Sequence, residues 1–281
     1  MAKKKSEFLS LIKSLSFVLL KNPLIVTPFI VLAIIDYAAL TLIYLAPRAP
    51  FSKIMAPPIR RFWGEHFLHY PYNFSLIPKL FNYAHITISF TFGIFLSALF
   101  ISLIAKKYNS DSEKVSFLDM VFTAIRKYIP MVIFFGVFYG LSQVLFKFTG
   151  MVVQKSAIEQ SSVMGVQMVA NFFWSFLLQV FFAFMFPILI IENVGLFRTF
   201  CMNFPAVFRN FKLVFFAVLI PSLLYAGIIV NMLLLPRMVQ KYEPEVILVS
   251  LSINILLTVV IDLFITGFTS LLYMKIKNRK V

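Results

Sequence analysis

The stretch "SINILLTVVIDLFITGF", Ser252 to Phe268, decides the fold class. It is nearly all apolar and lies within a longer apolar segment, Val246–Met274. That segment exceeds the ~20 residues that a helix needs to cross about 30 Å of hydrocarbon. The only charged residue of the stretch is Asp262. A carboxylate at the centre of a bilayer costs about 2.5–3.5 kcal/mol, so the stretch predicts a membrane-spanning helix whose carboxylate needs an explanation.

The rest of the chain has the same character. Of its 281 residues, 60% are hydrophobic and only 13% are charged, which is too little charge to cover the surface of a soluble domain. Neither a Gly/Ser linker nor a change of composition divides the chain. We therefore expect one all-α integral membrane domain, residues 1–281, with six transmembrane helices. The six predicted spans are Leu24–Leu45, Ile86–Ala105, Met131–Leu145, Val163–Ile191, Leu213–Leu235 and Val246–Met274.

The distribution of basic residues predicts the orientation. If the N-terminus is cytoplasmic, the inside segments hold 17 of the 26 Lys and Arg residues, as the positive-inside rule favours. An even number of spans then places both termini in the cytoplasm. The basic start lacks a small-residue cleavage site after an apolar core, so we do not interpret it as a signal peptide. Because the charges flank spans and form no patch in a soluble domain, we exclude nucleic-acid binding.

Three similar segments indicate an internal repeat. They are "FLSLIKSLSFVLLKN" (Phe8–Asn22), "FLDMVFTAIRKYIP" (Phe117–Pro130) and "LFRTFCMNFPAVFRN" (Leu196–Asn210). Each alternates apolar residues at helical spacing with basic residues, as an amphipathic helix at the membrane interface does. Each also leads into a span. We expect three units, each an interfacial helix followed by two spans, although any helix beside a membrane has a similar pattern.

The longest external connection is the Pro- and aromatic-rich loop 46–84. Its six prolines argue against another long helix, except in "IRRFWGEHFLHY", Ile59–Tyr70. There we expect a short helix on the outer leaflet, because Trp and Tyr favour the headgroup region. Glu65, His66 and His69 are spaced as metal ligands on a helix could be, but only His85 follows as a further ligand. We therefore expect no metal site.

The segment "FPILIIENVGLFRTFCMNFPAVFRN", Phe186–Asn210, resembles the membrane domain associated with bacterial glycerophosphoryl diester phosphodiesterases. The shared features are a proline near the end of a span, an aliphatic run into Glu192, then Gly195 and an amphipathic helix ending in Arg209-Asn210. Bulky Phe197 and Phe200 depart from the small residue and serine of that family. The resemblance implies a six-span fold in a bacterial-type cytoplasmic (inner) membrane. No soluble segment could hold the catalytic domain of that family, so it implies no phosphodiesterase activity.

Polar residues inside the predicted spans are the candidate functional residues. Asn254, Thr258 and Asp262 recur every fourth residue on one face of the last span. Asp36 lies at a similar depth in the first span. The fourth span carries a second polar stripe that includes Asn171 and Gln179. Such residues face protein or water rather than lipid.

Three interpretations of these residues remain open. They could join helices by hydrogen bonds, line a polar pathway or cavity for a solute or lipid headgroup, or form a catalytic pair of aspartates. Ile35 and Ile261 stand directly before the two aspartates, where intramembrane aspartyl proteases have a glycine motif. We therefore expect no enzyme, and no Walker-type loop or Gly-x-Ser-x-Gly motif predicts a cofactor. We expect transport or lipid handling, or alternatively a non-catalytic scaffold that binds a membrane-protein partner or a second copy of itself.

Overall fold

The computed structural model describes residues 2–108, 117–155, 160–231 and 245–278, all in helices and their connections. Six of its helical segments are long and apolar enough to cross a membrane. The residues predicted at 232–235 of the fifth span lie outside the described ranges, as do Lys114, Arg237, Lys241, Arg279 and Lys280 of the charge pattern. The six segments are Pro23–Tyr44, Tyr72–Tyr108, Phe117–Val153, Gly165–Ile191, Phe211–Asn231 and Val246–Asn278.

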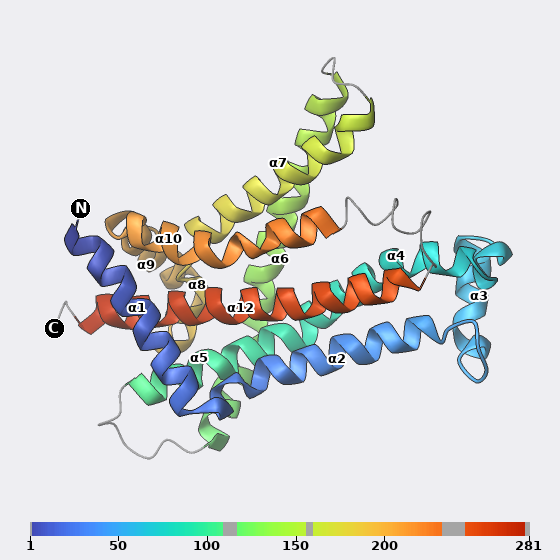
Figure 1. Ribbon diagram of the computed structural model, residues 1–281. Coiled ribbons are helices and arrows are strands. Elements are labelled where there is room, and N and C mark those ends of the chain that lie inside the picture. The colour runs from blue at the N-terminus through green and yellow to red at the C-terminus, as the bar shows by residue number, and fades with distance from the viewer. Residues whose placement is uncertain (1, 109–116, 156–159, 232–244, 279–281) are drawn as a thin grey trace.

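The chain begins with α1 (Ala2–Lys21), which packs across the last helix, α12 (Val246–Asn278). Leu15 of α1 is fully buried at this crossing, where Gly267 leaves space for its side chain. A Cβ atom at Gly267 would lie 2.9 Å from Leu15 Cδ1. Lys275 Nζ also donates a hydrogen bond to Ser10 Oγ at 2.9 Å. The two ends of the described chain therefore meet at one end of the bundle (Figure 1).

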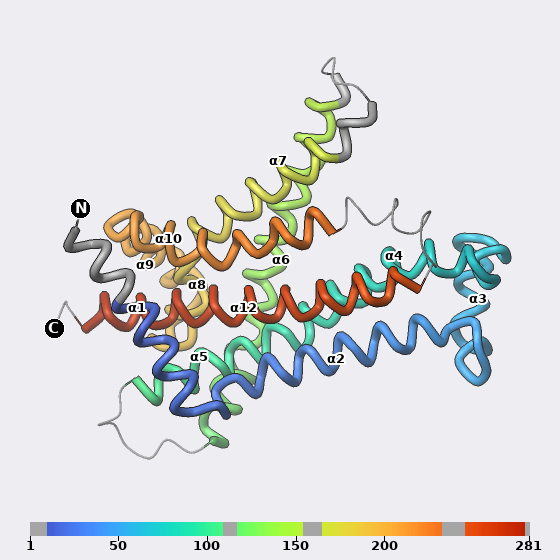
Figure 2. Tube along the Cα trace, viewed as in Figure 1, coloured from blue at the N-terminus to red at the C-terminus, as the bar shows by residue number. Residues whose placement is uncertain are grey.

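The first span is a short 3₁₀ segment, Pro23–Val26, followed by α2 (Thr27–Tyr44). The second is α4 (Tyr72–Ile88), a π-helical turn at Ser89–Gly93, and α5 (Ile94–Tyr108). Both pack against α12, so segments far apart in sequence lie side by side in the tube of Figure 2. At the end of the bundle nearer the external segment 46–84, α2, α4 and α12 share a cluster of buried apolar residues: Leu40, Ile43, Phe74, Ile77, Phe81, Ile247, Leu251 and Ile255.

The external segment differs from its prediction. The helix expected at Ile59–Tyr70 is wrong: α3 (Ser52–Phe62) ends where that helix should continue, and a 3₁₀ turn at Glu65–Leu68 follows. Gly64 separates the two with φ +106°, a conformation that ends a right-handed helix. Pro57 and Pro58 lie inside α3, where the carbonyls they leave unpaired belong to an exposed face of the helix.

The second span also begins earlier than predicted. Pro78 lies inside α4, because the buried apolar face of this helix packs on α2 and outweighs the lost hydrogen bond of the proline. The helix therefore starts at Tyr72 instead of at Ile86. This change places His85 within a spanning segment.

A helical hairpin of α6 (Phe117–Lys155) and α7 (Gln160–Phe181) leans away from the other spans (Figure 1). The interfacial helix expected at Phe117–Pro130 is not a separate element, because α6 passes through Pro130 without interruption. Only 11% of the most apolar stretch of the spanning segment Phe117–Val153 is buried. The α6 helix therefore presents much of its apolar surface outward. The threefold repeat stays a prediction.

The end of α7 is tied to the following elements by one buried amide. α7 breaks at residues 182–184 before the short α8 (Met185–Ile191), and α9 (Leu196–Arg209) returns beneath the break. Asn203 of α9 donates a hydrogen bond to Phe181 O at 2.8 Å and accepts one from Phe184 N at 3.1 Å. The two backbone groups that the break leaves free are thus satisfied. α10 (Phe211–Ser222) and helical residues 224–231 then form the fifth span.

Candidate functional site

Two adjoining cavities lie between the α6–α7 hairpin and the rest of the bundle. The larger, the α7–α10 cavity, has a volume of about 420 Å³ and lies between α7 and the fifth span. The smaller, the Asp262 cavity, has about 170 Å³ and lies between α6, α8 and α12. Phe138 and Gln179 line both, so the two cavities share a wall.

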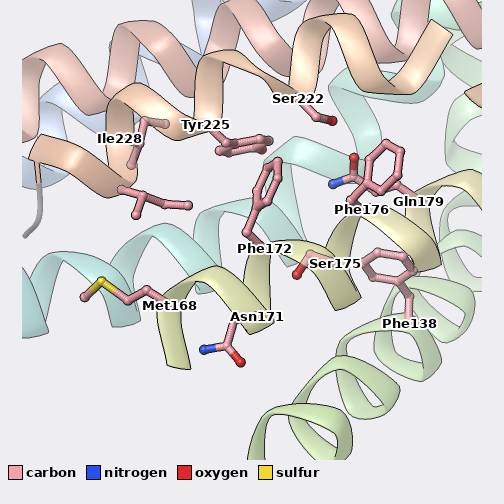
Figure 3. A pocket seen from close by; sticks show the side chains of 11 residues that line it. Phe138, Met168, Asn171, Phe172, Ser175, Phe176, Gln179, Ser222, Tyr225 and Ile228 are labelled. Atoms are coloured by element: carbon pink, nitrogen blue, oxygen red, sulfur yellow. The ribbon is translucent and has the colours of Figure 1, made fainter. Parts of the chain in front are cut away.

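The polar stripe of α7 faces the larger cavity. Asn171, Ser175 and Gln179 lie one helical turn apart, which places all three on the same face, and all three line the cavity (Figure 3). Ser222 and Tyr225 line it from the opposite wall, three residues apart across the junction of α10 with residues 224–231. The helical period of the sequence therefore produces a polar strip on one wall and a polar pair on the other.

Three polar atoms of this cavity are buried without a hydrogen-bond partner among the described residues. They are Asn171 Oδ1, Gln179 Oε1 and Ser222 Oγ. Leaving one buried polar group unpaired costs about 1–3 kcal/mol. Six other side-chain atoms of the described residues are also buried without a partner, among them Asp36 Oδ2, Ser250 Oγ and Asn254 Nδ2, but none of the six lines either cavity. The three unpaired atoms thus lower the stability of the folded protein, and the packing of the helices does not account for them.

Asp262 is partly exposed and lines the smaller cavity together with Thr266 and Thr269. Tyr225 Oη donates a long hydrogen bond of 3.4 Å to Asp262 Oδ1. Because Tyr225 lines the larger cavity, this contact joins the polar groups of the two cavities. Among the described residues that line either cavity, Asp262 is the only charged one.

Asp36 lies in a different setting. It is fully buried, and its Oδ1 lies 3.1 Å from His85 Nδ1 on α4. His85 interacts electrostatically with both Asp36 and Asp262, and of the two only Asp36 lies within hydrogen-bond distance of its ring among the described contacts. Asp36 lines neither of the two cavities. Its oxygen Oδ2 has no hydrogen-bond partner among the described residues.

Asn254 and Thr258 also lie away from the cavities. Asn254 Oδ1 accepts a hydrogen bond of 3.0 Å from Asn231 Nδ2, which also donates to Ser250 O at 3.2 Å. This contact joins α12 to the fifth span. Thr258 lies on α12 one turn before Asp262, partly buried, and lines neither cavity. The structure thus places Asn171, Gln179 and Asp262 of the candidate residues at the cavities and Asp36, Asn254 and Thr258 outside them.

His85, Ser222 and Tyr225 belong to these groups but are not among the residues predicted from sequence. The predicted second span starts at Ile86 and leaves His85 just outside it. A longer span would have marked it as an imidazole at membrane depth. Ser222 and Tyr225 carry a weak signal, a three-residue spacing within an apolar span. No group of three or more His, Cys, Asp or Glu side chains that could hold a metal ion occurs within the described ranges.

Comparisons with family models, with characterised proteins and with solved structures found no match to this chain. The resemblance of Phe186–Asn210 to a phosphodiesterase-associated membrane domain therefore stays a prediction. In this segment the turn after α8 is held from two sides. Lys127 Nζ donates to Val194 O at 2.9 Å, and Glu192 Oε1 accepts from Tyr273 Oη at 2.9 Å and pairs with Lys277 Nζ at 3.0 Å.

Proposed function

We propose that this protein is a membrane protein that binds and moves a small solute or a lipid headgroup through the two adjoining cavities. The observation that carries the proposal is the set of three buried polar atoms, on Asn171, Gln179 and Ser222, that face a cavity without hydrogen-bond partners in the described part of the chain. A ligand that forms hydrogen bonds with these atoms would remove the free-energy cost of leaving them unpaired. In this proposal the chain carries no catalysis.

The size and lining of the larger cavity support the same proposal. Cavities that bind small molecules have volumes of roughly 300–1,000 Å³ and mostly apolar walls with a few convergent polar groups. At about 420 Å³ the α7–α10 cavity falls in this range. Its apolar lining comes from Phe138, Met168, Phe172, Phe176, Ile228 and Ile229.

The alternative is a membrane scaffold or accessory subunit whose polar residues only join helices. Two contacts favour it: the Asp36–His85 pair and the Asn231–Asn254 hydrogen bond, both between spans and both outside the cavities. A scaffold would keep a dry centre and bind a membrane-protein partner or a second copy of the chain. The gathering of three unpaired atoms at one cavity weighs against this alternative, because hydrogen bonds that only join helices do not require polar groups to collect around a cavity.

We further propose that the protein lies in a bacterial-type cytoplasmic membrane with both termini in the cytoplasm. Three features support this orientation: the excess of basic residues on the side of the termini, the six candidate spans, and the position of α3 at the end of the bundle opposite to α1 (Figure 1).

Cysteine accessibility tests the proposed function. The single native cysteine, Cys201, is exposed and is replaced by serine first. Ser175→Cys then places a thiol in the α7–α10 cavity with little change of volume. Ser270→Cys is the matched control, because Ser270 is fully buried on α12 and lines neither cavity. We expect a small charged thiol reagent to modify Cys at 175 and to leave Cys at 270 unmodified.

Equal protection of both positions in folded protein would contradict a water-accessible cavity and favour the scaffold. Folding is checked by a monodisperse elution profile and by the helical circular dichroism spectrum. Applying the reagent from one side of sealed vesicles at a time then identifies the face from which a solute enters.

A further inference from the structure

The described residues that line the two cavities carry only negative charge. Asp262 is the only charged residue among the described lining residues, and no Lys or Arg accompanies it there. Its one described hydrogen bond, from Tyr225, is long at 3.4 Å and comes from a neutral group. An ionised carboxylate at this place would therefore attract a cation rather than an anion.

The nearest titratable neighbours leave that charge in place. His85 is the basic group that interacts with Asp262, but its Nδ1 lies 3.1 Å from the Asp36 carboxylate. A protonated His85 is thus neutralised by Asp36, and a neutral His85 contributes no positive charge. In both states the group of Asp36, His85 and ionised Asp262 keeps a net negative charge.

The unpaired hydrogen-bonding atoms of the larger cavity also favour a cation. Two of its three unpaired atoms, Asn171 Oδ1 and Gln179 Oε1, are carbonyl oxygens and can only accept hydrogen bonds. The third, Ser222 Oγ, can also accept. A ligand that satisfies them must donate hydrogen bonds, as an ammonium group does. Asn171 and Gln179 lie eight residues apart on α7, about 12 Å, so a single ammonium group reaches only one of them at a time.

The walls provide a second means of stabilising a cation. The ring of Phe172 points toward that of Tyr225, and Phe138 and Phe176 also line the larger cavity (Figure 3). Aromatic faces attract ammonium groups by about 0.5–2 kcal/mol, more when water is excluded. Aromatic rings also accommodate the apolar part of an organic ion.

We propose that the two cavities form a binding site for an organic ammonium cation, with Asp262 as its counter-ion, the Gln179 carbonyl as a hydrogen-bond acceptor for the ammonium group and the Asn171 carbonyl as an acceptor farther along the larger cavity. This inference rests on the proposed function, since it names the class of ligand for the same cavities. The ammonium group has two sources, a free amine or the headgroup of an aminophospholipid.

The test uses the Ser175→Cys protein in lipid nanodiscs and two thiol reagents of similar size and opposite charge. These are the trimethylammonium-ethyl and the sulfonato-ethyl methanethiosulfonates, and each rate is divided by its rate with a free thiol. We expect the positive reagent to react at least about tenfold faster, because the field of a buried charge concentrates ions of opposite sign by that order or more. Benzylammonium, which carries three N–H donors, should slow the reaction, and benzenesulfonate should not.

Substitutions at Asp262 assign this selectivity to its carboxylate. Asp262→Asn should bring the ratio of the two rates close to one, whereas Asp262→Glu should preserve it. Glu65→Gln is the matched control: it makes the same chemical change at an exposed carboxylate paired with Arg60, outside the cavities. If Asp262→Asn does not fold, the ratio in the unsubstituted protein and in Asp262→Glu still tests the proposal.

The outcomes separate this inference from the proposed function. If neither reagent modifies Cys at 175, the proposed function fails, and the inference fails with it. If both reagents react at similar normalised rates, or benzenesulfonate protects as well as benzylammonium, the cavity is accessible but not selective, and only the cation inference is overturned.

Lipid composition identifies the source of the ammonium group. If phosphatidylethanolamine competes with benzylammonium in nanodiscs otherwise made of phosphatidylglycerol, the natural ligand class is a lipid headgroup. If it does not compete and the probe still protects, the class is a free organic amine. Both results support the ammonium site.

Discussion

Asp36 and His85 pair across two neighbouring spans, 3.1 Å apart, with the carboxylate fully buried. Removing one member of such a pair costs about 3–5 kcal/mol, because a buried charge remains without its partner. Removing both leaves only apolar packing. We therefore predict that His85→Leu destabilises the protein more than the double substitution Asp36→Leu/His85→Leu does. Unfolding in mixed micelles titrated with dodecyl sulfate measures both. Additive losses would contradict a coupled pair, and exposed Glu65→Gln should change stability by at most about 1 kcal/mol.

Asn203 is predicted to be structural rather than functional. Its side chain makes the two hydrogen bonds that satisfy the backbone at the break after α7, and it is fully buried. Asn203→Leu would leave Phe184 N and Phe181 O unpaired, at a cost of about 2–4 kcal/mol. The unfolding transition should shift accordingly, while Phe197→Leu on an exposed position of the same helix should shift it little. Unchanged stability of Asn203→Leu would refute this role.

The crossing of α1 and α12 depends on the absence of a side chain at Gly267. A larger residue there meets the buried Leu15, whose Cδ1 would lie 2.9 Å from a new Cβ. We expect Gly267→Leu to cost about 1–3 kcal/mol through overpacking, and Leu15→Ala in the same chain to restore part of the loss. Gly140→Leu is the control, since a Cβ at Gly140 meets nothing within 4 Å. Failure of Leu15→Ala to compensate would show that the contact does not limit packing.

The six spans could be predicted from sequence, because they follow from the length and apolarity of their segments. Each described span overlaps its predicted range. The errors occur where tertiary packing overrides a local signal. Pro78 disfavours a helix locally, yet the buried face of α4 holds one. The positive φ of Gly64, which ends α3 early, has no counterpart in hydrophobic periodicity.

The candidate site was predictable only in part, for a related reason. A four-residue period shows that Asn171, Ser175 and Gln179 share a face, but it does not show what that face meets. The stripe on α12 illustrates the limit: Asp262 lines a cavity, whereas Asn254 pairs with Asn231. The two residues have the same spacing pattern and different roles, because the neighbouring helix differs along α12. Only the positions of α6, α7 and α10 distinguish them.

That distinction leads to the sharpest prediction about stability. Gln179 Oε1 is buried without a partner among the described residues, so Gln179→Leu removes an unsatisfied group and should leave stability unchanged or raise it by up to about 1 kcal/mol. Asn254→Leu removes the acceptor of Asn231 and should cost about 0.5–2 kcal/mol, the range for hydrogen bonds between membrane helices. Stability is measured by unfolding in mixed micelles.

The order of the two substitutions should be reversed for ligand access: Gln179→Leu should have the larger effect and Asn254→Leu the smaller. Gln179→Leu should slow modification of Cys at 175 and weaken its protection by benzylammonium, because an apolar side chain replaces an acceptor in the shared wall of the two cavities. Asn254→Leu, which lies outside both cavities, should leave that reaction unchanged in the protein that remains folded. A stabilised protein with lost access identifies a residue kept for function at the expense of stability. If Gln179→Leu instead destabilises the bundle as much as Asn254→Leu does, the α7 stripe joins helices and the scaffold alternative gains its main support.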